Sequence, residues 1–61
     1  MHQDKQYLIF PSNRAEARIQ AKRIAMFEFG VRRPSNVDIL ETARFRDRRG
    51  VTGYTVWVRV A

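Results

Sequence analysis

The sequence contains no cysteine, a single histidine, three glycines and two prolines. Without thiols the chain has no disulfides and no thiolate metal sites. The one imidazole, on His2, supplies too few ligands for a structural metal centre. No apolar run approaches the ~20 residues needed to cross a bilayer. We therefore expect no metal, no cofactor and no membrane partner.

Residues 1–5 are polar and lack the apolar stretch of a signal peptide. We expect them to form a flexible N-terminus of a cytoplasmic protein. The 61 residues correspond to a single domain, 1–61. A domain this small buries only about 60% of its unfolded surface, so its stability is marginal. With disulfides and metals excluded, association with another chain or with a ligand is the remaining way to stabilise it, and we expect a homo-oligomer.

Acidic residues are scarce relative to basic ones. Six Asp and Glu face twelve Lys and Arg, which gives a net charge of +6. Ten of the twelve cations are arginine, whose planar group of donors suits phosphates and carboxylates. A charge this far from zero concentrates anionic partners around the protein. Nucleic acid, either DNA or RNA, is the first expectation, and an acidic protein surface is the second.

The first half of the chain predicts a strand followed by a helix. The short apolar run Tyr7–Phe10 ends at a proline, as expected for a strand. Asn13 is suited to cap a helix, and Glu16 follows three residues later, as in a capping box. The segment Arg14–Phe29 contains four alanines and neither proline nor glycine. Gly30 then supplies the left-handed residue that commonly ends a helix.

The second half predicts a β-hairpin. Residues 37–45 alternate between two faces, and residues 54–60 alternate valines and aromatics with polar residues. Between them, Asp47-Arg48-Arg49-Gly50 has the composition of a turn. A regular hairpin closed by Asp47 and Gly50 places these pairs on the inner face: Val37 with Val60, Ile39 with Val58, and Ala43 with Tyr54. The outer face then carries these pairs: Asp38 with Arg59, Leu40 with Trp57, and Thr42 with Thr55. Glu41 falls on the inner face in this register.

The predicted fold class is therefore α+β, in the order β-α-β-β. We expect a three-stranded, mostly antiparallel sheet with one helix packed on one face. This layout resembles, over about residues 6–60, that of the dodecins, small flavin-storing proteins whose long strands assemble into a shell. Dodecins carry their flavin-stacking tryptophan in the second strand, whereas Trp57 lies in the third. The resemblance is one of layout, and it transfers neither the flavin nor any site residue.

The outer face of the hairpin is the main candidate for function. There an exposed Trp57 would lie among arginines, an arrangement that allows stacking on bases while guanidinium groups hold phosphates. The turn adds further arginines that can contact a nucleic-acid backbone. The predicted nucleic-acid-binding residues are Arg44, Arg46, Arg48, Arg49, Trp57 and Arg59. An alternative is that Trp57 only covers Leu40, or that this face is an oligomer interface.

The helix carries Arg14, Arg18 and Lys22 in one stripe, four residues apart. Apolar residues occupy more than one other sector of it, which favours contact with a second subunit. Alanines at positions 17, 21 and 25 would allow another helix to approach closely. The alternative function is therefore a structural or protein-interaction module, acting as a homo-oligomer or within a larger assembly.

Catalysis is not expected. The six acids are scattered along the chain, and the sequence contains no Ser-His-Asp set, phosphate-binding loop or glycine-rich dinucleotide loop. A general acid or base needs a titrating group held in a cleft, and no segment predicts one. The sequence thus favours a small, basic, non-catalytic accessory protein that binds nucleic acid.

Overall fold

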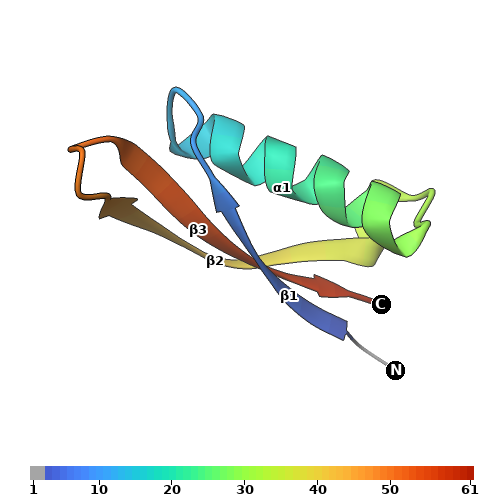
Figure 1. The fold of residues 1–61 in the computed structure, drawn as a ribbon. Helices are drawn as coiled ribbons and strands as arrows, with labels where there is room; N and C mark the ends of the chain where they lie inside the picture. Colours follow the sequence, from blue (N-terminus) through green and yellow to red (C-terminus); the bar gives the residue numbers. More distant parts are fainter. Residues whose placement is uncertain (1–2) are drawn as a thin grey trace.

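The computed structural model describes residues 3–61. Its elements are strand β1 (Gln3–Ile9), helix α1 (Arg14–Phe29), a 3-10 turn η1 (Pro34–Asn36), and strands β2 (Val37–Arg46) and β3 (Thr52–Val60). The sheet order is β1-β3-β2, and β3 is antiparallel to both neighbours. Helix α1 lies along one face of this sheet (Figure 1). The predicted α+β class, the order β-α-β-β and the single packed helix are confirmed.

Strand β1 begins earlier than the sequence predicts. Residues 3–5 were expected to belong to a flexible N-terminus, but Gln3 and Lys5 pair with Val60 and Val58 of β3. The remainder of that expectation, at residues 1 and 2, lies outside the described residues. Pairing with residues 54–60 of β3 gives β1 seven residues.

Helix α1 has the ends that its sequence predicts. Asn13 is extended, and its side-chain oxygen accepts a hydrogen bond from the backbone N–H of Glu16 at 2.9 Å. The Glu16 carboxylate accepts a hydrogen bond from the Gln20 amide one turn later. Gly30 is left-handed, with φ of 66°, and Val31 N donates to the carbonyl of Met26 at 2.8 Å. Because these caps satisfy backbone groups at both ends, the helix boundaries are set locally.

A three-residue loop joins β2 and β3. Asp47 accepts hydrogen bonds from the N–H groups of Arg49 and Val51 through its side chain, and its own N–H donates to the carbonyl of Val51. Gly50 has φ of 81°, the left-handed conformation that favours glycine. The predicted contact across the turn is present, since Gly50 N–H donates to the carbonyl of Asp47 at 3.0 Å. The strand ladder, however, closes between Asp47 and Val51, so its register is one residue beyond the predicted one.

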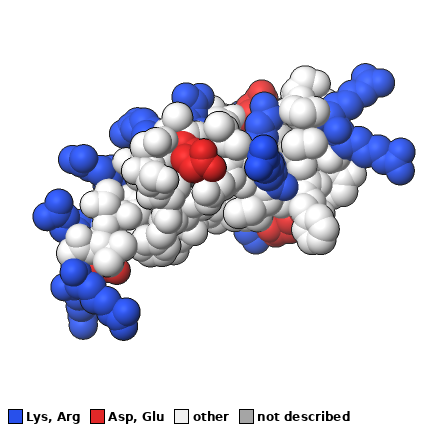
Figure 2. All heavy atoms as spheres, turned by 90° about the horizontal axis from the view of Figure 1, so that it is seen from above, with Lys and Arg blue, Asp and Glu red and all other residues white. Residues whose placement is uncertain are grey.

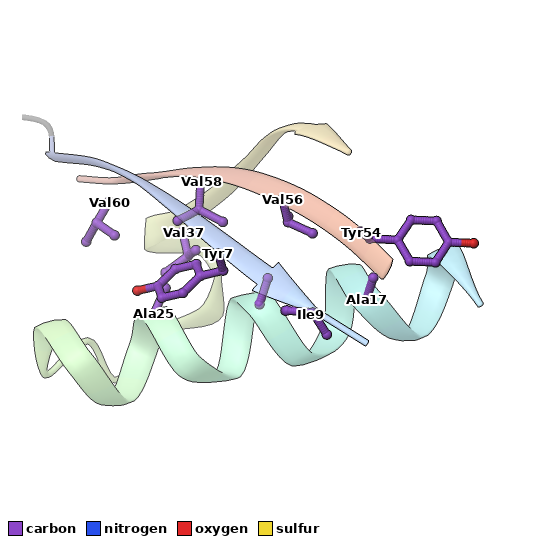
Figure 3. Close-up of a cluster of buried hydrophobic side chains, with 10 residues drawn as sticks. Tyr7, Ile9, Ala17, Ala25, Val37, Tyr54, Val56, Val58 and Val60 are labelled. Atoms are coloured by element: carbon purple, nitrogen blue, oxygen red, sulfur yellow. The ribbon is translucent and has the colours of Figure 1, made fainter. Parts of the chain in front are cut away.

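The core lies between α1 and the inner face of the sheet. Ala17, Ala21 and Ala25 are fully buried there and lie on one side of the helix, because they are four residues apart. From the sheet, Tyr7, Ile9, Val37, Tyr54, Val56, Val58 and Val60 point toward them (Figure 3). The alanines therefore bring α1 close to its own sheet. The expected role of these alanines, a surface for a second helix, is wrong.

None of the helices formed by residues 3–61 combines the length and apolar character needed to span a membrane.

Candidate nucleic-acid interface

A bulge at Leu40 divides strand β2 into two halves. Before the bulge, Val37 pairs with Val60 and Ile39 with Val58, as predicted. After it, Glu41 pairs with Trp57. The longer turn shifts the pairing of residues 41–46 by one position from the predicted register. The extra residue at Leu40 cancels this shift, so residues 37–39 pair as predicted. Since side chains alternate along a strand, a shift of one residue moves the second half of β2 to the opposite faces.

Several predicted pairs are therefore wrong beyond the bulge. Ala43 pairs with Thr55 on the outer face, not with Tyr54 on the inner one, and Thr42 pairs with Val56. Glu41 lies exposed, and not on the inner face, because it shares the face of Trp57. A signal for this shift is present in the sequence, since the adjacent apolar residues at 39 and 40 interrupt the alternation.

The same shift separates the predicted site residues. Arg44 pairs with the core residue Tyr54, and Arg46 pairs with Thr52, so both lie on the helix side of the sheet. Trp57 and Arg59 remain on the outer face. The predicted arrangement of Trp57 among Arg44, Arg46 and Arg59 is therefore not formed. Arg48 and Arg49 lie in the turn and are exposed, in the positions that the sequence indicates.

Arg59 is engaged within the chain. Its Nε and Nη2 donate to the two carboxylate oxygens of Asp4 at 2.8 and 3.1 Å, a two-point pairing across β1 and β3. Asp4 raises the pKa of Arg59, and Asp38, its partner on β2, adds to the effect. Because these two donors are already bound to a carboxylate, Arg59 is less able to bind a phosphate.

Trp57 lies half-buried at the centre of the outer face. Its cross-strand neighbours are Gln6 on β1 and Glu41 on β2, and neither is a cation. A stacking platform flanked by arginines is therefore not present around this indole.

On the helix side, the structure brings together two rows of cations. Arg18 and Lys22 of α1, with Ala15, Ile19 and Ile39, line a shallow groove of about 320 Å³ between the helix and β2. A smaller hollow of about 160 Å³ adjoins it and is lined by Arg14, Arg18, Ile39, Leu40, Glu41 and Thr42, so one carboxylate borders the cations there. Arg44 and Arg46 follow Thr42 on the same side of β2. We call Arg14, Arg18, Lys22, Arg44 and Arg46 the basic surface.

Few of the cations are neutralised by acids of the chain. Within residues 3–61, ion pairs join Lys5 to Glu28 at 3.0 Å and Arg59 to Asp4 at 2.8 Å. The other ten lysines and arginines of that range form none. Figure 2 shows basic side chains gathered at the end that carries the hairpin turn and again at the opposite end. The basic surface and the turn arginines are thus available to an external anion.

No protein-family model, curated protein or solved structure matches this chain. The dodecin-like order of elements remains a likeness of layout. The function must therefore be argued from the site itself.

Proposed function

We propose that this protein binds nucleic acid through the basic surface and the turn arginines, Arg48 and Arg49, and that it acts without catalysis as a cytoplasmic accessory protein. The observation that supports this is that these cations lie on the same side of the sheet, the side that carries α1. The strand register puts Arg44 and Arg46 on the helix side of the sheet, which is also the side of the stripe on α1. The proposed ligand is the one expected from the sequence, but the proposed site no longer includes Trp57 and Arg59.

The spacing of these cations fits a repeating chain of phosphates. Along α1, residues four apart rise by about 6 Å, and alternate residues of a strand are separated by about 6.6 Å. Arg14, Arg18 and Lys22 form one such row, and Arg44 and Arg46 form another. Contacts of this kind hold a phosphate backbone without reading its sequence. We therefore expect binding that depends little on base composition.

Salt dependence is the primary test. Binding of a mixed-sequence 20-mer, as duplex DNA and as single-stranded RNA, is measured by fluorescence anisotropy between 50 and 300 mM salt, roughly the range over which phosphate contacts are lost. If five phosphates are contacted, the logarithm of the duplex affinity should fall with a slope of about −4.5 against the logarithm of the salt concentration. Salt-independent binding, or none at 50 mM salt, contradicts the proposal.

A charge-matched pair of variants separates the site from the overall charge. Arg44→Gln with Arg46→Gln should weaken binding at least about tenfold and reduce the salt slope by about 2, one for each lost phosphate contact. Arg32→Gln with Arg33→Gln removes the same charge beside the end of α1 and should have a smaller effect. Equal losses in the two double variants would show that net charge alone is responsible.

The second candidate function is a structural or protein-interaction module. The observation that favours it is the outer face of the sheet, where large apolar side chains are left without a covering helix. This face and the basic surface lie on opposite sides of the sheet, so both can be occupied at once.

A further inference from the structure

The outer face of the sheet is apolar over half its length. It is formed by Asp4, Gln6 and Leu8 of β1, by Gly53, Thr55, Trp57 and Arg59 of β3, by Asp38, Glu41, Ala43 and Phe45 of β2, and by Phe10 beyond β1. Leu8 is 64% exposed and Phe10 is 57% exposed. The ring of Phe10 packs edge-on against that of Phe45, with centroids 5.6 Å apart. Both rings lie over Gly53, so this end of the face is a formed aromatic cluster.

Large apolar side chains on this face are left exposed in the single chain. Tyr7, Ile9 and Tyr54 are buried in the core with the valines. Leu8 and Phe10 remain outside. In a chain this small, burial of the larger apolar groups adds substantially to a marginal stability.

Charge argues against nucleic acid as the occupant. Asp4, Asp38 and Glu41 lie on the outer face, and Arg59 is the single cation that the strand register places there. Among residues 3–61, acids therefore outnumber bases on this face, whereas the net charge of the protein is +6. A phosphate backbone would be repelled here and attracted to the opposite side.

A second copy of the chain fits the shape and the pattern of this face. A two-fold axis parallel to β3 stacks β3 on its counterpart and β1 on β2 of the other copy. Leu8 and Phe10 of one chain then meet Ala43 and Phe45 of the other, so the two aromatic ends close on each other. Two sheets stacked with nearly aligned strands are a common packing, about 10 Å apart.

The size of the molecule permits such a contact. The two longest extents of the Cα trace, 37 and 18 Å, set an upper limit of about 670 Å² on the face of each copy. For two copies this limit lies above the ~1,000 Å² expected of a specific interface. We propose that a second copy of this chain covers the outer face, giving a homodimer with its helices and basic surfaces on the outside.

The oligomeric mass tests this proposal in the absence of nucleic acid, so its result is independent of the proposed function. Light scattering should give twice the chain mass of 7.2 kDa for the wild type. Leu8→Lys places a charge in the apolar half of the interface and should give the monomer mass. Phe27→Lys is the matched control, because Phe27 is 92% exposed on the helix, away from this face, and should leave the dimer intact.

Two results overturn the proposal. One is a wild-type chain that has the monomer mass at the highest concentration measured. The other is a dimer that Phe27→Lys dissociates and Leu8→Lys does not, since that would place the interface on the helix. Circular dichroism of Leu8→Lys confirms that the variant is folded before its mass is compared.

The single tryptophan gives a second, local measurement. Trp57 lies at the centre of the outer face, so dimer formation should remove it from water. Its emission should be at shorter wavelength in the wild type than in folded Leu8→Lys, and Phe27→Lys should match the wild type. Addition of the 20-mer should leave the emission unchanged. The same emission in wild type and Leu8→Lys, or quenching by the 20-mer, would contradict the dimer and favour the outer face as a nucleic-acid surface.

Discussion

The two faces of the sheet differ in what they bury. The inner face contacts α1 through three alanines and a row of valines, with the helix close to the strands. The outer face has no helix over it and carries Leu8, Phe10 and Trp57. The alanines of α1 allow close approach of two layers within one chain. The exposed Leu8 and Phe10 of the outer face would provide area for the proposed contact between chains.

The largest expected effect comes from enlarging an alanine of the inner face. Ala21 is fully buried between helix and sheet, so Ala21→Leu should reduce the free energy of unfolding by about 3 kcal/mol, the upper end of the range for over-packing. Ala15→Leu makes the same change at an exposed position of the helix and should alter stability by less than about 0.5 kcal/mol. Urea denaturation measures both. A tolerated Ala21→Leu would show that the inner face is loosely packed.

A smaller effect is expected at the aromatic end of the outer face. A Cβ added at Gly53 would lie 2.6 Å from the ring of Phe45 and 2.9 Å from that of Phe10. Gly53→Ala should therefore cost about 1–2 kcal/mol, because the rings must move. In a Phe45→Ala background the same substitution should cost less, because only the ring of Phe10 must then move. Additive effects in thermal denaturation would mean that the rings do not pack over Gly53.

The smallest effect concerns a hydrogen bond at the rim of the inner face. The Tyr7 hydroxyl donates to Glu28 at 2.8 Å, and burial, with this carboxylate, raises the pKa of Tyr7 from 10.0 to about 12. Because the folded-state pKa is the higher one, this contribution is fully present below pH 10 and is lost as the pH rises through 12. Tyr7→Phe should cost about 1 kcal/mol at pH 7 and should flatten the alkaline loss of stability.

Tyr54→Phe serves as the control for that measurement, since it removes the hydroxyl of the other tyrosine and leaves Tyr7 in place. Denaturation midpoints recorded between pH 7 and 12, a window that contains the folded and unfolded pKa values of Tyr7, give the comparison. An unchanged alkaline slope in Tyr7→Phe would contradict the assignment.

The elements with strong local signals were predictable from sequence. Asn13 and Gly30 set the ends of α1 through their own hydrogen bonds and backbone angles, so no tertiary information was needed. The alternation of residues 54–60 likewise identified β3 and its inner face. In both cases the physical cause lies within a few residues of the chain.

The register of the hairpin was only half predictable. A left-handed Gly50 lengthens the loop by one residue, which shifts the pairing of residues 41–46 with β3. The bulge at Leu40 cancels this shift, so Ile39 pairs as predicted. Each event moves side chains to the opposite face, and alternation alone does not locate either one. The charge of the site was therefore predictable, whereas the side on which Arg44 and Arg46 lie was not.

Strand β2 lies at the border of the sheet, and within residues 3–61 only β3 pairs with it. An uninterrupted border strand offers a row of unpaired amide and carbonyl groups to strands of other molecules. Removing Leu40 would restore a regular ladder, because Ile39 and Glu41 already pair with the adjacent Val58 and Trp57. This one additional residue thus interrupts the row of amide and carbonyl groups that β2 presents, and it disfavours pairing of another strand along this border.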